Sequence, residues 1–138
     1  MPITKKGFNS IEKAVTRVEC RLAKIPSFAG IVADHYWLQV FYAAERRQLQ
    51  KCDRWEVWQY AHQNESCWGH LHKNLLTPCK GVGNGPSQLI QQWIDEEALS
   101  IAKKVKSSPR TYPFIANYRY WPGPNSNTFA QWIVGEKS

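Results

Sequence analysis

Residues 120–134 read YWPGPNSNTFAQWIV and carry more structural information than any other part of the chain. Two prolines and a glycine make a tight, stiff turn, because proline restricts φ and glycine adopts conformations that other residues avoid. The four polar residues that follow are all favourable helix N-caps, and Phe129, Trp132 and Ile133 then recur at helical spacing. The stretch therefore predicts a rigid turn leading into a buried helix, with Ser126 in the first turn of that helix.

A serine at this position is placed to act as a nucleophile or to hydrogen-bond a ligand. The first N–H groups of a helix have no partner within the helix, and together with the helix dipole they suit a bound anion or a developing oxyanion. Nucleophiles of acyl transfer are often presented in this way. On spacing alone, a stiff turn followed by an ordinary capped helix is the more usual meaning of this pattern, and the pattern leaves both interpretations open.

Size and composition indicate one folded domain over residues 1–138. The hydrophobic share is 43%, and seven Trp, six Tyr and five Phe supply material for a core and argue against disorder. No apolar run is long enough to span a membrane, and no apolar stretch follows the first lysines, so a Sec-type leader is not expected. We therefore expect a protein that is cytoplasmic as made, or one secreted without a cleavable signal peptide.

The charge of the chain is strongly positive. Lys and Arg number 18 against 11 Asp and Glu, a formal net charge of +7, and the excess is concentrated in residues 5–24 and 103–119. Such a field attracts nucleic acid, an anionic membrane face or an acidic partner protein. Most of these lysines are also consistent with solvated helix surface, and charge alone does not identify a ligand.

Hydrophobic periodicity predicts an α+β order of elements. Ile11, Val15, Val18 and Leu22 recur at helical spacing after the N-cap candidate Ser10, which predicts an amphipathic helix within residues 1–27. Two runs rich in β-branched and aromatic residues predict an antiparallel hairpin with a charged connector. The expected elements are a helix over residues 10–24, strands Ile31–Tyr42 and Trp55–Ala61, a helix Gln88–Lys106, an extended piece Tyr112–Tyr120 and the helix that opens near Ser126.

His35 lies within the first predicted strand, where an imidazole has two nitrogens to satisfy. Paired with a nucleophile at a helix N-terminus it is a candidate general base. A hairpin that closes near Tyr42 and Arg54 brings His35 beside the end of the second strand. Gln59 then shares a face with the diagonal neighbour of His35 and is the first choice to orient the ring, and Glu56, of opposite parity, is the second.

These motifs resemble a known group of proteins. His-Tyr-Trp-Leu-Gln-Val on one strand, Trp-Glu-Val on the next and the terminal Trp-Pro-Gly-Pro-Asn-Ser-Asn-Thr-Phe are similar to an uncharacterised bacterial domain family. Its layout resembles circularly permuted papain-like (NlpC-type) proteins, in which the histidine strand precedes a helix that often opens with Asn-Cys-Asn. The resemblance implies a papain-like core over residues 28–134, with Ser126 in the cysteine position and His35 as the base.

That resemblance implies amidase, peptidase or acyltransferase chemistry, but serine is a weaker nucleophile than a thiolate. We therefore keep three hypotheses. The first is a hydrolase or acyltransferase on an amide or ester bond that uses Ser126, His35 and Gln59 and no cofactor, as a bacterial effector or toxin. The second is a small basic antibacterial toxin that cleaves nucleic acid with Mg²⁺ or Ca²⁺ and is neutralised by an acidic immunity partner. The third is a catalytically silent binding domain.

Metal ligation is a minor alternative. Cys67, His70, His72 and Cys79 are zinc-competent, but their spacing matches no structural zinc pattern, so buried reduced cysteines and surface histidines are expected instead. Asp34 and Glu56 are the carboxylates that a nuclease metal would need. No metal site is predicted.

Overall fold

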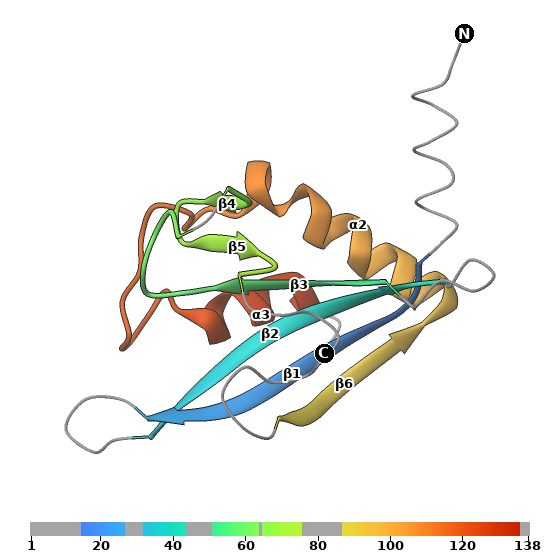
Figure 1. Ribbon diagram of the computed structural model, residues 1–138, viewed down its shortest axis with the longest axis horizontal. Coiled ribbons are helices and arrows are strands. Elements are labelled where there is room, and N and C mark those ends of the chain that lie inside the picture. The colour runs from blue at the N-terminus through green and yellow to red at the C-terminus, as the bar shows by residue number, and fades with distance from the viewer. Residues whose placement is uncertain (1–14, 27–31, 44–50, 64, 76–86, 136–138) are drawn as a thin grey trace, which may run out of the picture.

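The computed structural model describes residues 15–26, 32–43, 51–63, 65–75 and 87–135 (Figure 1). These residues form a small α+β domain, which confirms the expected class. Six antiparallel strands lie in the order β4-β5-β3-β2-β1-β6, with two helices packed against the sheet. The elements are β1 Val15–Pro26, β2 Val32–Tyr42, β3 Cys52–Val57, β4 Cys67–Trp68, β5 Leu71–Lys73, β6 Gln88–Ile94, α2 Asp95–Thr111 and α3 Ser126–Val134.

The first described element corrects the sequence prediction. Residues 15–24, expected within an amphipathic helix, belong to strand β1, which pairs with β2 from Val15 opposite Tyr42 to Pro26 opposite Val32. Residues 10–14 of that expected helix lie outside the described ranges. The competing pattern has a period of two, since charged and apolar residues alternate from position 17 to 22. Arg17 and Arg21 both contact Glu19, at 3.0 and 2.9 Å, on one side of the strand.

The predicted helix Gln88–Lys106 is also corrected. Its first seven residues form the edge strand β6, which pairs with β1 and so depends on β1 being a strand. Helix α2 begins at Asp95, which has a φ of +54°, and three acidic residues occupy its first turn. The helix then continues through Pro109 to Thr111, beyond its expected end.

The central hairpin and the last helix match the expectation more closely. Strand β2 coincides with the expected strand within one residue, whereas β3 runs from Cys52 to Val57 instead of Trp55 to Ala61. Helix α3 opens with a capping box in which Asn125 and Thr128 satisfy each other's backbone N–H groups. The expected extended piece Tyr112–Tyr120 is irregular instead.

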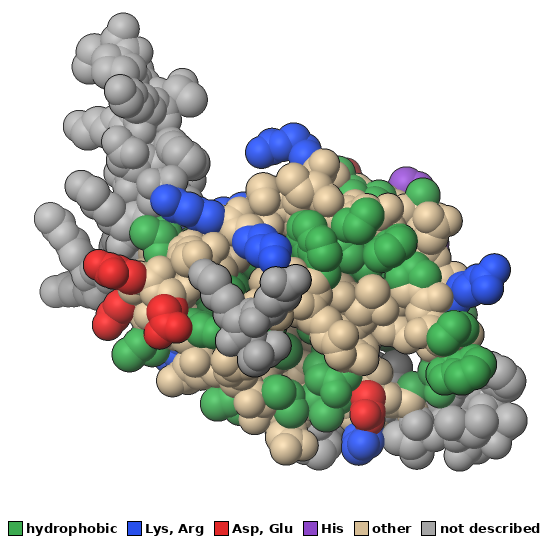
Figure 2. All heavy atoms as spheres, turned by 180° about the vertical axis from the view of Figure 1, so that it is seen from behind, with side chains coloured by type: hydrophobic (Ala, Val, Ile, Leu, Met, Phe, Trp, Pro, Cys, Tyr) green, Lys and Arg blue, Asp and Glu red, His purple; other side chains and the backbone are tan. Residues whose placement is uncertain are grey.

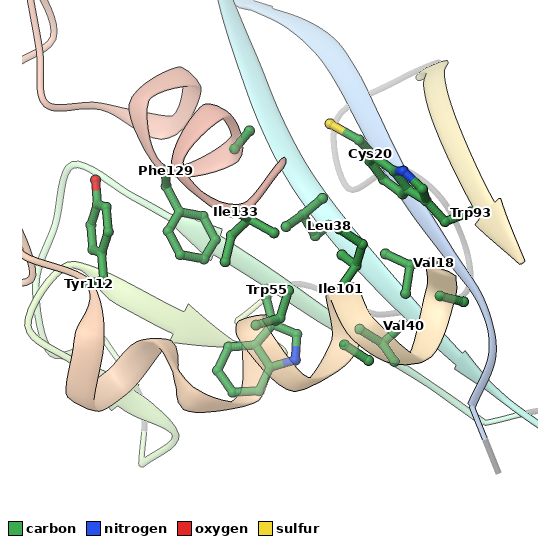
Figure 3. Packing of buried hydrophobic residues seen from close by; sticks show 14 of the residues in the cluster. Val18, Cys20, Leu38, Val40, Trp55, Trp93, Ile101, Tyr112, Phe129 and Ile133 are labelled. Atoms are coloured by element: carbon green, nitrogen blue, oxygen red, sulfur yellow. The ribbon is translucent and has the colours of Figure 1, made fainter. Parts of the chain in front are cut away.

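Both helices pack on one side of the sheet, which we call the helix face. Figure 3 shows Leu38 of β2 and Trp55 of β3 directed toward Ile101 of α2 and toward Phe129 and Ile133 of α3. Side chains of a strand alternate between the two faces of its sheet. The intervening residues therefore point the other way, to what we call the polar face, whose members include Arg17, Glu19, Arg21, His35, Trp37, Gln39, Arg54, Glu56 and His72.

Candidate functional site

The candidate site lies where β2 and β3 stop pairing. Their last described pair is Leu38 with Trp55, and the alternate N–H groups of β2 point at β3, as shown by Tyr42 N–H donating to Lys51 O. In a continued ladder the N–H of Tyr36 would reach a β3 carbonyl. It donates instead to Oγ of Ser126, at 3.2 Å. The first residue of α3 thus substitutes for a strand partner at this point.

His35, the residue before Tyr36, is held on the polar face by a carboxylate. Its Nε2 lies 2.5 Å from Oε2 of Glu56, and both side chains are buried. Within the part of the chain that the structure describes, Nδ1 of His35 has no hydrogen-bond partner. The Trp58 ring packs edge to face with the imidazole, with centroids 4.9 Å apart. The ring is therefore fixed through one nitrogen and leaves the other available.

Glu56 is in turn held by a buried guanidinium. Arg54 donates from Nε to Oε1 at 2.8 Å and from Nη2 to Oε2 at 3.0 Å, and it stacks on the ring of Trp37 at 3.9 Å. Burial by itself would raise the pKa of Glu56, but the hydrogen bond and charge of His35 and those of Arg54 outweigh it and lower the pKa below its usual value. Glu56 is therefore a carboxylate at neutral pH, buried together with its partners.

The position expected for Gln59 is occupied by Glu56. Gln59 lies beyond the end of β3 and is exposed, so its amide does not orient the imidazole. The cause is the register of the hairpin. In the structure Arg54 pairs with Gln39, whereas the expected closure placed Arg54 opposite Tyr42, so β3 is shifted by three residues relative to β2. An odd shift in register moves every side chain of a strand to the opposite face. This shift places Glu56 diagonally opposite His35.

Ser126 contacts the backbone next to His35, at the peptide nitrogen of Tyr36. With standard bond lengths, a contact of 3.2 Å to the Tyr36 nitrogen keeps Ser126 Oγ within about 6 Å of the His35 Cα. Along β2, Tyr36 points to the helix face and His35 to the polar face, and the serine hydroxyl lies at the strand edge between them. Across the described residues, no hydrogen bond joins the hydroxyl directly to the imidazole.

The start of α3 presents unpaired donors beside this hydroxyl. The N–H groups of Thr128 and Phe129 are taken by Asn125, through its side chain and its carbonyl respectively. Within the described ranges, the N–H groups of Ser126 and Asn127 have no protein acceptor. They belong to the first N–H groups of the helix, which we expected from the sequence to suit a developing oxyanion.

Most of the described residues considered for metal binding are engaged in other contacts. Asp34 is paired with Lys24 at 2.7 Å, and Glu56 is committed to His35 and Arg54. His70 bonds the Trp58 carbonyl through Nδ1, and His72 bonds that of Tyr60 through Nε2. No group of three metal-binding side chains occurs in the described part of the chain.

The cysteines differ from one another. Cys20 and Cys67 are not disulfide-bonded, whereas Cys52 is, which corrects the expectation of a reduced thiol for that residue. Cys79, the fourth cysteine and the last member of the zinc-competent set, lies outside the described residues.

The surface in Figure 2, on the reverse of the view in Figure 1, shows lysine and arginine side chains standing apart from one another among hydrophobic and polar residues. The net charge of +7 is therefore not gathered into one basic patch on that surface. None of the helices within the described ranges is both long enough and apolar enough to cross a membrane.

Comparison with known proteins gives a family but no function. No curated protein and no solved structure matches the chain. A family model described as a protein of unknown function (DUF3750) matches residues 15–138, which include every element around Ser126, His35 and Glu56. The chain therefore belongs to the DUF3750 family.

Proposed function

We propose that this domain is a papain-like hydrolase or acyltransferase that acts on an amide or ester bond through Ser126, His35 and Glu56. The observation that carries the proposal is the contact of the Ser126 hydroxyl with the backbone beside His35, whose ring is fixed by a buried carboxylate. Glu56 replaces Gln59 as the orienting residue of the hypothesis. No cofactor is required for this chemistry.

The order of elements supports the papain-like part of the proposal. A histidine strand, β2, is followed by a strand that carries its orienting group, β3, and the nucleophile helix α3 comes last in the chain. This is the order expected for permuted NlpC-type proteins. The antiparallel sheet and the helix N-terminus against its central strands agree with it.

The chemistry follows from the way the imidazole is held. A proton on Nε2 of His35 donates to the Glu56 carboxylate, so Nδ1 carries a lone pair and accepts the hydroxyl proton of Ser126. The Ser126 oxygen then bonds to the carbonyl carbon, and the carbonyl oxygen becomes an oxyanion that accepts from the N–H groups of Ser126 and Asn127. His35 returns the proton to the leaving amine or alcohol. Water or another acceptor releases the acyl group by the reverse steps.

The N–H of Tyr36 orients the nucleophile in this scheme. It occupies a lone pair of the Ser126 oxygen, which leaves the hydroxyl proton free to turn toward His35. The expected roles as an effector or toxin, and the acidic partner protein, stay predictions from the net charge of +7.

The test uses p-nitrophenyl acetate turnover together with labelling by a fluorophosphonate. Ser126→Ala should lower the turnover of p-nitrophenyl acetate by at least about a hundredfold. It should also abolish the mass increase that follows fluorophosphonate labelling. Ser108→Ala is the matched control, because Ser108 is also buried but its hydroxyl donates to the Val105 carbonyl within α2. His35→Asn and Glu56→Gln should lower turnover while circular dichroism stays unchanged. Full turnover in Ser126→Ala and His35→Asn would discard the mechanism, and a folded protein without turnover or labelling would favour a silent binding domain.

A further inference from the structure

A groove of about 1110 Å³ opens on the helix face beside α3. Its walls come from the length of α3, from the middle of α2 around Ile101, and from β6 at Ile90. Its volume lies just above the range of about 300–1,000 Å³ for small-molecule sites. The groove is therefore large enough for a ligand of substantial length.

One end of the groove lies next to the proposed nucleophile in the chain. Asn127 and Thr128, the two residues after Ser126, line it, and so does the side chain of Tyr36. Tyr36 therefore lines the groove with its side chain while its N–H holds the Ser126 hydroxyl. A substrate whose reacting carbonyl lies at Ser126 therefore has the groove next to it.

The lining is mainly apolar and nearly uncharged, with Gln91, Ser100, Asn127, Thr128 and Gln131 as its neutral polar members. Ile90, Ile101, Trp132 and Ile133 supply hydrophobic surface, and no carboxylate is among the lining residues that the structure describes. Lys104 is the one cation among them, and its Nζ donates to the Trp132 carbonyl at 2.5 Å and lies 5.0 Å from the centroid of the Trp132 ring. Such a lining suits an aliphatic chain and offers no counter-ion to a cationic substrate.

We propose that this groove binds the acyl chain of the substrate, so that the substrate is an ester or amide of a linear aliphatic acid. The inference rests on the proposed function, because it takes Ser126 as the position of the scissile carbonyl. Each buried methylene contributes about 0.8 kcal/mol. Converted into rate, this predicts a rise of about fourfold in kcat/KM for each added methylene until the groove is filled.

The experiment measures kcat/KM for p-nitrophenyl esters from acetate to dodecanoate. Two β6 variants form a matched pair, because Leu89 and Ile90 are exposed to 43% and 45% but only Ile90 lines the groove. Ile90→Ser should lower the ratio of kcat/KM for octanoate to that for acetate by about tenfold, and Leu89→Ser should leave the ratio as in the parent. Turnover with a flat chain-length profile, or equal ratios in the two variants, would overturn the groove proposal while leaving the proposed function intact.

A binding measurement separates the two proposals. Decanoate is titrated into the unmodified protein and into Ser126→Ala and followed by tryptophan fluorescence, to which Trp132 in the groove wall contributes. Saturable binding by both proteins, weakened in Ile90→Ser and not in Leu89→Ser, supports the groove even if no ester is turned over, and the proposed function alone then fails. Absence of saturable binding, or a dimer that Ile90→Ser dissociates and that excludes decanoate, would overturn the groove proposal.

Discussion

The two faces of the β2–β3 hairpin are buried to the same degree but by different chemistry. On the helix face, Leu38 and Val40 are 0% exposed and pack among aliphatic and aromatic side chains of the core. On the polar face, Arg54 and Glu56 are 1% and 0% exposed and are satisfied chiefly by each other and by His35. The same two strands thus combine a hydrophobic core with a buried cluster of charges.

This difference separates stability from chemistry. Removing apolar side chains from water stabilises a fold without further conditions, whereas burying ions costs desolvation that their attraction only partly repays. A buried carboxylate that fixes an imidazole is therefore weak evidence for stability and stronger evidence for a functional site. The helix face supports α3, and the polar face sets the orientation of His35.

The first prediction sets one substitution on each face against the other. Arg54→Met leaves the Glu56 carboxylate without its guanidinium and should cost about 3–5 kcal/mol at pH 7. Leu38→Ala leaves a cavity in the core and should cost about 2–5 kcal/mol. Because the folded state holds the pKa of Glu56 below 4.5, the Arg54→Met penalty should shrink as that carboxylate is protonated in acid, and the Leu38→Ala penalty should stay constant. Urea unfolding at pH 7 and in acid measures both, and equal pH profiles would contradict the assignment of the faces.

The second prediction concerns the onset of acid sensitivity on the polar face. Burial lowers the pKa of His72 below 6.5, despite the opposing hydrogen bond to the Tyr60 carbonyl and the charge of Glu56. The folded state favours the neutral ring of His72, so the contribution of His72 to the free energy of unfolding is complete above pH 6.5. It is lost as the pH falls from 6.5 toward the folded pKa, at no more than about 1.4 kcal/mol per pH unit. Glu56 adds a further loss only below pH 4.5.

Urea unfolding across pH 4.5–7.5 tests this behaviour. His72→Phe should flatten the slope between pH 6.5 and 5, and His62→Gln, at an exposed histidine, should leave the slope as it is. An unchanged slope in His72→Phe would remove His72 as the source of acid sensitivity.

Local signals in the sequence predicted the C-terminal part of the site. The Pro-Gly-Pro turn and the run of four N-cap candidates located the start of helix α3, and the structure selects Asn125, the first of the four, as the N-cap. The β-branched and aromatic run located β2 and His35 within it. These features are set by residues close together in the chain, so they can be predicted from a single sequence.

Features set by long-range pairing were missed. Helical spacing at Val15, Val18 and Leu22 concealed the alternation of charged and apolar residues in β1, and β6 was missed with it because β1 is its partner. The choice between Gln59 and Glu56 depended on hairpin register, which the long connector left undetermined. The alternation at residues 17–22 and the acidic residues 95–97 at the start of α2 were signals that locate these elements.

The third prediction concerns α3, which packs on the helix face and meets β2 where the hairpin opens. Asn125 accepts from the Thr128 N–H at 3.2 Å and donates to the Tyr120 carbonyl at 2.9 Å, so it fixes both the helix start and the preceding turn. Asn125→Ala should cost about 1 kcal/mol and lower Tm by roughly 3–5 °C. Asn117→Ala is the control, because Asn117 is exposed in the preceding segment and its backbone N–H makes the hydrogen bond to Phe114 O. Calorimetry of the two variants measures the difference, and equal melting temperatures would show that the cap does not hold Ser126 in place.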